Sequence, residues 1–249
     1  MLDLNNYSKD EILRGHLTLF QAFDAPRVNL DTILLSSWVE IHSNNSRFLE
    51  IGCASGAISL ILALKFKGSF KITGLEIQKN LAELADYNLK LNSNSENNLS
   101  ERVSFIHGDI REKNIFPKNY FDAIVINPPY ESIERSRISK NISLTTAKID
   151  STCSPDDIAE ASSRLLKSKG RLFTVYNTAR ITEFISSMTS RKIILKRLKF
   201  VHPKSNRNSN IFLAEFMKDA KNGVIILPPL IVYDENGNYT QETLNSYKI

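Results

Sequence analysis

Cysteine is scarce in this chain of 249 residues, which contains only Cys53 and Cys153. The two are far apart in the sequence, and neither belongs to a Cys-x-x-Cys or Cys/His grouping. The sequence therefore predicts neither a disulfide framework nor a zinc site. We expect a protein without a bound metal, in a reducing cytoplasm.

Long apolar runs are also missing. The longest, "AISLILALKF" and "VIILPPLIV", are too short to span a bilayer. The first twenty residues interleave charged and apolar positions, so they contain no stretch that could act as a secretory signal. We expect a soluble, unexported protein that does not enter a membrane.

Neither sign of charge dominates strongly. The formal charge is +5 and the sequence pI is about 9.1, which suits a polyanionic partner without requiring one. The composition, 42% hydrophobic and 24% charged, is that of a globular protein rather than a disordered or fibrous one. A chain of this length can form one main domain with appendages.

What is present, from Arg47 onward, is a regular alternation of strand-like and helix-like segments. Strands are predicted at residues 47–52, 71–77, 102–109, 120–127 and 171–177, and helices at 55–66, 79–92 and 154–169. Such βα repeats predict an α/β fold: a Rossmann-like, doubly wound, mostly parallel sheet with helices on both faces.

The third of these helices has clear signals at its ends. Ser154 can cap it, Pro155 suits its first position, and Asp156 and Asp157 complement the helix dipole. Gly170 is expected to follow its last turn.

Three regions are predicted. Residues 1–46 form an N-terminal extension on the substrate side, with a helix after Asp31, and residues 47–217 form the main domain. After a helix at 181–191, two strand-like runs at 192–202 and 210–218 predict a C-terminal antiparallel pair. Residues 218–249 are expected to be a C-terminal tail.

The turn "EIGCASG" lies where a strand passes into a helix, the place at which α/β sheets bind ligands. Glu50, Gly52 and Gly56 belong to it, Glu76 ends the next strand, and Asp109 ends the third. Glu76 has the position of a ribose-binding carboxylate, and Asp109 could accept a bond from an adenine amino group.

An ordinary tight turn, or a site for a nicotinamide cofactor, would also explain the turn taken alone. The middle glycine of a G-x-G-x-G pattern is replaced by Ala54, and no third glycine follows in the dinucleotide spacing. Both features favour a smaller adenosine cofactor over one with a pyrophosphate.

The fourth strand ends in "NPPY", Asn127 to Tyr130. The Asn127 carbonyl and the next backbone carbonyl can accept the N–H bonds of a planar amine, while Pro128 and Pro129 fix the direction of both acceptors. Tyr130 supplies a face on which a base or amide can stack. A turn that only closes the strand is the alternative, but the combination with Glu76 favours a functional site.

This tetrapeptide is the signature of amino-methyltransferases that use S-adenosylmethionine. Together with "RVNLDTILLSSW", "LEIGCASG" and the C-terminal "KFVHPKSNRNSNIFLAEFMKDAKNGVIILPPLIVYDENGNYTQE", it makes most of the chain resemble the bacterial tRNA1(Val) adenine-N6 methyltransferase family. The resemblance implies a class I methyltransferase fold and an enzyme that methylates N6 of the adenosine 3′ of the anticodon, position 37, in a valine tRNA.

The same resemblance implies roles for individual residues. Cofactor-binding residues would be Glu50, Gly52, Gly56, Glu76, Asp109 and Asn127. Catalytic residues, which receive the target base, would be Asn127, Pro128, Pro129 and Tyr130. The base would be flipped from the anticodon loop into this pocket, and a monomer is favoured.

Basic residues suggest where tRNA phosphates would bind. Between residues 191 and 207 there are seven Lys or Arg residues and no Asp or Glu. The predicted RNA-binding residues are Arg135, Arg137, Lys140, Arg197, Lys199, His202, Lys204 and Arg207. A solvated strand face is the alternative explanation.

Three other functions fit the same motifs. The tetrapeptide would also hold a protein glutamine amide or a guanine amine of rRNA, although 46 residues are few for the helical domain that usually grips a protein substrate. A non-catalytic RNA-binding module with this fold is the third, and Ala54 keeps it open.

Overall fold

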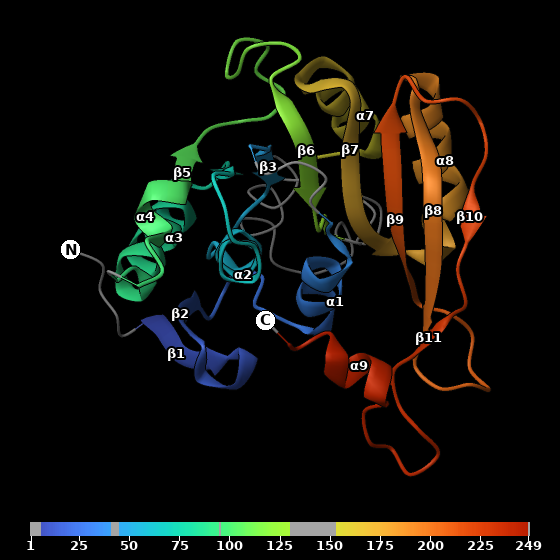
Figure 1. Ribbon diagram of the computed structural model, residues 1–249, viewed down its shortest axis with the longest axis horizontal. Coiled ribbons are helices and arrows are strands. Elements are labelled where there is room, and N and C mark those ends of the chain that lie inside the picture. The colour runs from blue at the N-terminus through green and yellow to red at the C-terminus, as the bar shows by residue number, and fades with distance from the viewer. Residues whose placement is uncertain (1–5, 41–44, 95, 130–152, 249) are drawn as a thin grey trace, which may run out of the picture.

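The computed structural model describes residues 6–40, 45–94, 96–129 and 153–248, in which nine strands form one large sheet and two more form a separate hairpin (Figure 1). The strands are β1 Tyr7–Ile12, β2 Leu17–Ala22, β3 Arg47–Ile51, β4 Lys71–Glu76, β5 Val103–His107, β6 Phe121–Ile126, β7 Leu166–Asn177, β8 Ile193–His202, β9 Ile211–Lys218, β10 Ile225–Ile226 and β11 Leu230–Ile231. The order in the large sheet is β10-β8-β9-β7-β6-β3-β4-β5, and β11 also pairs with β8.

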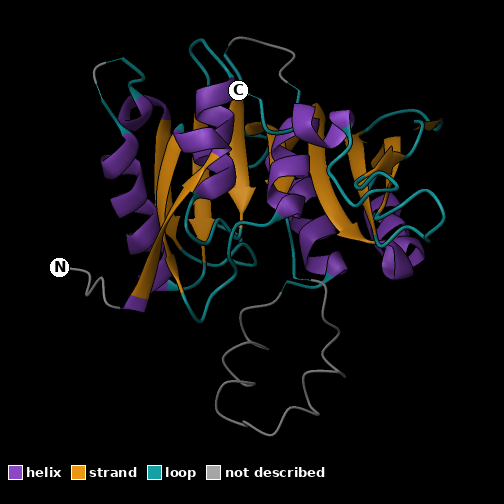
Figure 2. Cartoon of the chain, turned by 90° about the horizontal axis from the view of Figure 1, so that it is seen from below, coloured by secondary structure: helices purple, strands orange, loops and turns teal. Residues whose placement is uncertain are grey.

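Helices connect the strands and cover the sheet. They are α1 Leu30–Trp38, α2 Ala57–Lys65, α3 Lys79–Asn92, α4 Leu99–Arg102, α7 Pro155–Leu165, α8 Ile181–Ser190 and α9 Gln241–Asn245, with 3-10 turns at Leu13–Gly15 and Thr178–Arg180. Figure 2, a view turned by 90°, shows helices packed along the length of the sheet.

Alternation along the strands divides the core into two layers. On β6, Ala123 and Val125 pack in the layer that contains α1 and α2, whereas Ile124 and Ile126 pack in the layer that contains α7 and α8. Successive side chains of a strand point to opposite faces, so the buried apolar run from Ala123 to Ile126 must be covered on both. The doubly wound α/β prediction is therefore confirmed.

The strand order reverses its direction at one position in the sheet. From β3 the chain moves outward to β4 and β5, then returns to β6 on the other side of β3 and continues to β7. All of these strands are parallel. The carboxyl ends of β3 and β6 therefore flank the topological switch point, where sheets of this kind bind ligands.

The predicted start of α7 is confirmed, but its predicted end is wrong. The hydroxyl of Ser154 accepts a bond from the Asp157 amide and the Asp157 carboxylate accepts one from the Ser154 amide, a capping box with Pro155 at the first position. The helix ends at Leu165 rather than next to Gly170, because fully buried Leu166 already pairs with Phe121 of β6.

The predicted antiparallel pair is present as β8 and β9. The chain after β9 does not leave the sheet at once: β10 and β11 both pair in parallel with β8, and Leu230 and Val232 are buried in the α1–α2 layer. Fully buried Thr243 of α9 donates its hydroxyl to the Val232 carbonyl at 3.1 Å. Much of the segment expected to be a tail thus completes one edge of the sheet.

The N-terminal segment contains a hairpin that sequence patterns did not predict. β1 and β2 form an antiparallel pair, and β2 lies against α3 rather than against the large sheet. Its alternation of buried Leu17 and Leu19 with partly exposed Thr18 and Phe20 is the period-two signal that could have revealed it. The helix predicted after Asp31 is present as α1 and begins at Leu30.

Candidate cofactor and acceptor site

The turn between β3 and α2 is built from three residues in the left-handed conformation. Gly52 has φ +71°, Gly56 has φ +82° and Ala54 between them has φ +46°. Glycine adopts this conformation freely, whereas a residue with a Cβ pays for it. Ala54 therefore keeps the backbone shape of the glycine pattern at some cost in strain.

The two glycines are needed for different reasons. A Cβ on Gly56 would lie 2.5 Å from the Phe105 ring, which also fills the space above Gly74 of β4. A Cβ on Gly52 would meet none of the described residues within 4 Å, and Gly52 is exposed at the edge of the sheet. Gly56 thus serves internal packing, while Gly52 leaves open backbone that a ligand can approach.

Glu76, at the end of β4, is joined to this turn through its carboxylate. Oε2 accepts a bond of 2.9 Å from the Ala54 amide, and Oε1 accepts one of 3.0 Å from the Gln78 amide. The residue is only 4% exposed. Each carboxylate oxygen can accept a second bond, so the group is held in place with capacity left for ribose hydroxyls.

Glu50, at the end of β3, caps a helix from a distance. Gly56 is the N-cap of α2 and has no side chain to offer, and Glu50 Oε2 instead accepts from the amide of Ser59 at 2.8 Å and from its hydroxyl. Burial, with 3% exposed, raises the Glu50 pKa to about 8 against the bonds from Ser59, which lower it. Its role in lining the cofactor stays a prediction.

Asp109, which follows β5, forms a close pair with Arg111. Its Oδ1 accepts from the Arg111 amide at 2.8 Å, and the guanidinium Nη2 lies 2.6 Å from Oδ2. The side-chain bonds from Arg111 hold the Asp109 pKa below its usual value. An adenine amino group would have to share this carboxylate with Arg111, and that role also stays a prediction.

These features fit an adenosine cofactor that carries no pyrophosphate. Backbone is exposed at Gly52, the Glu76 carboxylate is fixed one strand away, and both lie at the carboxyl edge of adjacent parallel strands. The Gly56 position, by contrast, is closed by the Phe105 ring, so this part of the turn is packed rather than open for a second phosphate.

The end of β6 lies directly beside this turn. Ile126 pairs with Ile51 of β3, so Asn127, Pro128 and Pro129 leave the sheet next to Gly52. Pro128 is buried, Asn127 is partly buried and Pro129 is exposed. The structure thus brings the predicted acceptor segment to the predicted cofactor turn; Tyr130 lies outside the described residues.

Acidic side chains from other elements neutralise two of the predicted RNA-binding cations. The Arg197 guanidinium lies 2.9 Å from Glu40 and 3.1 Å from fully buried Glu215 of β9, and it stacks on the Trp38 ring at 4.6 Å. Lys199 pairs with Glu242 of α9. Arg197 and Lys199 of strand β8 therefore already form ion pairs within the protein.

The loop between β8 and β9 presents the other predicted cations. Lys204 and Arg207 are exposed, and in the part of the chain that the structure describes neither side chain has an acidic partner. His202 Nδ1 lies 2.7 Å from the Arg207 carbonyl and closes the loop. Arg135, Arg137 and Lys140 lie outside the described residues.

The described ranges offer neither a metal site nor a membrane span. They contain no cluster of His, Cys, Asp and Glu that could hold a metal ion, and no helix there has the length and apolar character needed to cross a membrane.

The sheet has its switch point at β3 and β6, and a glycine turn, a fixed acidic residue on β4 and an Asn-Pro-Pro segment lie beside it. This is the arrangement of the class I methyltransferase fold. A family model described as a methyltransferase domain matches residues 42–213. The chain belongs to this family.

Relatives with assigned names are similar along much of the chain. It is 28% identical over 167 residues to the tRNA1(Val) (adenine(37)-N6)-methyltransferase of Shewanella frigidimarina, an alignment that covers 66% of this chain and 63% of that protein. It is 24% identical over 227 residues to the protein of the same name from Shewanella sp. strain MR-7, covering 89% of this chain and 90% of the relative.

Among solved structures, a protein described as a predicted O-methyltransferase from Agrobacterium tumefaciens superposes with a TM-score of 0.67 at 18% identity. It covers 88% of this chain and 97% of its own. At this identity the similarity concerns the fold alone, and it confirms the expected class I methyltransferase architecture.

Two residues that hold the site together were not found from the sequence. Ser59 donates its amide and hydroxyl to Glu50 Oε2, and Asn88 of α3 donates a bond of 2.9 Å to the Ser55 carbonyl in the cofactor turn. Both are fully buried polar side chains. A serine or asparagine on the apolar side of a predicted helix is the signal that could have revealed them.

Proposed function

We propose that the protein transfers the methyl group of S-adenosylmethionine to the exocyclic N6 of adenosine 37 in a valine tRNA, as a monomer in the cytoplasm. Relatives that align over most of the chain carry this activity in their names. S-adenosylmethionine, when bound, would supply an electrophilic methyl group, and the turn at Gly52 together with Glu76 would hold it.

The observation that carries the proposal is the placement of Asn127 beside the cofactor turn, fixed by the Ile51–Ile126 pairing. The adenine amine is a poor nucleophile because its lone pair is delocalised into the ring. The Asn127 side-chain carbonyl and the Pro128 backbone carbonyl would accept its two N–H bonds and favour a tetrahedral nitrogen. The amine loses its proton after attack, so no strong base is needed.

The docking surface that we propose for tRNA lies at the same edge of the sheet. β8 runs parallel to β7, because both are antiparallel to β9 between them. The loop that follows β8 therefore emerges at the carboxyl edge, on the side of Asn127. Lys204 and Arg207 in this loop are the described cations that we expect to contact phosphates, joined by Arg135, Arg137 and Lys140.

The activity can be tested with labelled S-adenosylmethionine and unmodified tRNA, followed by digestion and mass spectrometry of the labelled nucleosides. N6-methyladenosine from the position 3′ of the anticodon is expected. Label on guanosine would refute the proposed acceptor while keeping the chemistry. Absence of label in the RNA, with cofactor bound, would refute the tRNA substrate and leave a protein glutamine substrate or a non-catalytic RNA-binding protein.

The proposed docking surface can be tested with a pair of variants at opposite ends of β8. Lys204→Glu with Arg207→Glu should weaken tRNA binding and reduce the slope of log affinity against log salt by about 1.5 to 2, since each lost phosphate contact removes nearly one unit. Arg191→Glu with Lys192→Glu makes the same charge change before β8, at the far edge. Equal effects of the two pairs would show that only net charge matters.

A further inference from the structure

On the outer edge of strand β2, the backbone groups are paired by no other strand of the described residues. Thr18 and Phe20 lie opposite Glu11 and Lys9 of β1, yet their amides donate to side chains of α3 instead. Unsatisfied backbone groups at a packed edge are costly, so something must replace the missing strand. Two asparagines of α3, Asn88 and Asn92, do this.

Each asparagine makes the same pair of bonds with one residue of β2. Asn88 Oδ1 accepts from the Phe20 amide at 2.8 Å and its Nδ2 donates to the Phe20 carbonyl at 2.9 Å. Asn92 does the same with Thr18, at 2.9 and 2.7 Å. Four residues of helix advance about 6 Å and two residues of strand about 6.7 Å, so the two spacings match.

The remaining donor of each amide distinguishes the two residues. Asn92 donates it to the Asn88 carbonyl, within its own helix, at 2.7 Å. Asn88 donates it to the Ser55 carbonyl, in the turn between β3 and α2, at 2.9 Å. Asn88 is fully buried and uses both donors and its acceptor. It therefore links the hairpin to the cofactor turn directly, and Asn92 does not.

The turn is held at two consecutive residues. The Ala54 amide is fixed by Glu76 and the Ser55 carbonyl by Asn88, and Gly56 follows in the left-handed conformation. The Ala54 side chain packs on the small apolar cluster of Leu81, Leu84 and Ala22, which joins α3 to β2. The shape of the turn thus depends on α3 and on the hairpin that α3 carries.

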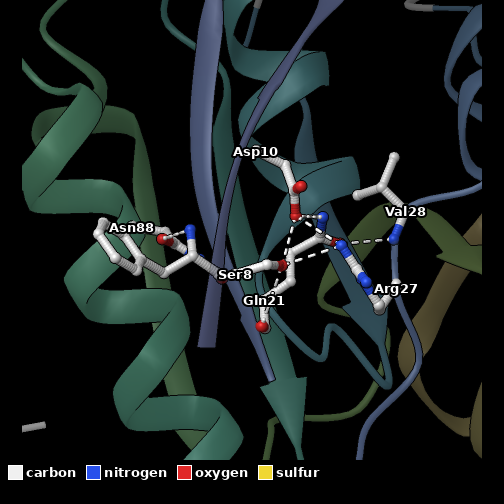
Figure 3. Close-up of polar contacts among 7 residues, drawn as sticks. Ser8, Asp10, Gln21, Arg27, Val28 and Asn88 are labelled. Atoms are coloured by element: carbon white, nitrogen blue, oxygen red, sulfur yellow. Dashed lines mark hydrogen bonds and ion pairs between the residues drawn. The ribbon is translucent and has the colours of Figure 1, made fainter. Parts of the chain in front are cut away.

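A polar network keeps the hairpin and the segment after it in one piece (Figure 3). The Asp10 carboxylate accepts from Ser8 at 2.6 Å, from Gln21 at 2.7 Å and from Arg27 at 2.8 Å. The Gln21 side-chain oxygen in turn accepts from the Val28 amide at 2.6 Å. Because these bonds span β1, β2 and the chain leading to α1, displacement of the hairpin would disturb the whole segment.

We propose that Asn88 is a positioning residue for cofactor binding: through its bond to Ser55 it couples docking of the N-terminal hairpin to the geometry of the S-adenosylmethionine turn. By linkage, a cofactor that favours the ordered turn also stabilises the docked hairpin. The inference concerns the cofactor and does not depend on which acceptor is methylated.

The matched pair Asn88→Ala and Asn92→Ala separates this role from simple hairpin docking. Each variant removes the bonds of one α3 asparagine to β2, but only Asn88→Ala also frees the Ser55 carbonyl. Titration calorimetry with S-adenosylmethionine should show about 10-fold weaker binding for N88A, the loss of a buried hydrogen bond, and less than about 2-fold for N92A. Equal weakening by both variants, or none by either, would overturn the proposal.

Amide exchange of the unaltered protein, followed by NMR, gives a second test that does not require N88A to fold. Saturating S-adenosylmethionine should slow exchange of the Phe20 and Thr18 amides as well as that of Ala54, by about 5-fold or more. Protection confined to the turn would refute coupling to the hairpin. Both readouts use cofactor binding alone, so a wrong tRNA target would leave them unaffected.

Discussion

The cofactor turn and strand β8 present the same kind of signal, charged residues at the end or along the length of a strand, but the structure treats them in opposite ways. At the turn, consecutive residues of one loop gather around exposed backbone at Gly52. On β8, Arg197 and Lys199 meet acids that come from β9 and α9 and from just after α1. A site formed within one turn can be read from neighbouring residues, whereas the net charge of a strand depends on partners far away in the chain.

The largest effect is expected at the acceptor end of the turn. Asn127→Ala should lower the single-turnover rate by about 100- to 1000-fold with little change in cofactor affinity, because it removes an acceptor aimed at the reacting amine. Asn127→Asp, which keeps a carbonyl oxygen, should retain part of the rate. An unaltered rate for the alanine variant would exclude the proposed role of this carbonyl.

On the β8 side, the corresponding prediction concerns stability. Glu215→Gln leaves Arg171 and Arg197 without their buried carboxylate and should lower the free energy of unfolding by about 3 kcal/mol. Glu242→Gln breaks the more exposed pair with Lys199 and should cost less than about 1 kcal/mol. Urea denaturation measures both, and equal losses would contradict the contrast between a buried and an exposed partner.

A substitution of Glu76 tests whether the carboxylate that orders the turn also binds the cofactor. Glu76→Gln replaces an acceptor of two backbone amides, at Ala54 and Gln78, and should weaken S-adenosylmethionine binding by about 10-fold or more. Glu83→Gln, on the exposed face of α3, is the charge-matched control and should bind normally. Calorimetry that found no difference between the two variants would remove Glu76 from the site.

The last prediction concerns the pH dependence of stability at Glu50. Its pKa is raised from 4.5 to about 8 in the folded protein, so between these values the folded state retains a proton that the unfolded state has lost. The contribution of Glu50 to the free energy of unfolding therefore falls as the pH rises from 4.5 to 8. Glu50→Gln cannot titrate, so this loss should be absent in the variant. Its stability relative to the natural protein should therefore be higher at pH 9 than at pH 5. Denaturant midpoints of both proteins at both pH values measure this. The same change with pH in the two proteins would exclude a contribution from Glu50.

Much of this architecture could be predicted because the signals for each helix and strand lie close together in the sequence. The helix at Ser154 has cap, proline and acids within four residues, and its start was found correctly. Its end was not, since Leu166 is drawn into the sheet by Phe121, 45 positions earlier. The hairpin was not predicted although β2 alternates with period two, and no local pattern indicates that asparagine side chains of α3 complete its outer edge.

The sequence by itself determined the βα order, the glycine turn and the Asn-Pro-Pro end of β6, because each depends on residues adjacent in the chain and on a regular period. Only the tertiary structure decided that Glu50 caps α2, that Arg197 is held by Glu215, and that Asn88 joins the hairpin to the cofactor turn. Each of those contacts satisfies a buried polar group that must find a partner wherever the fold places it, and no spacing along the chain encodes which partner that will be.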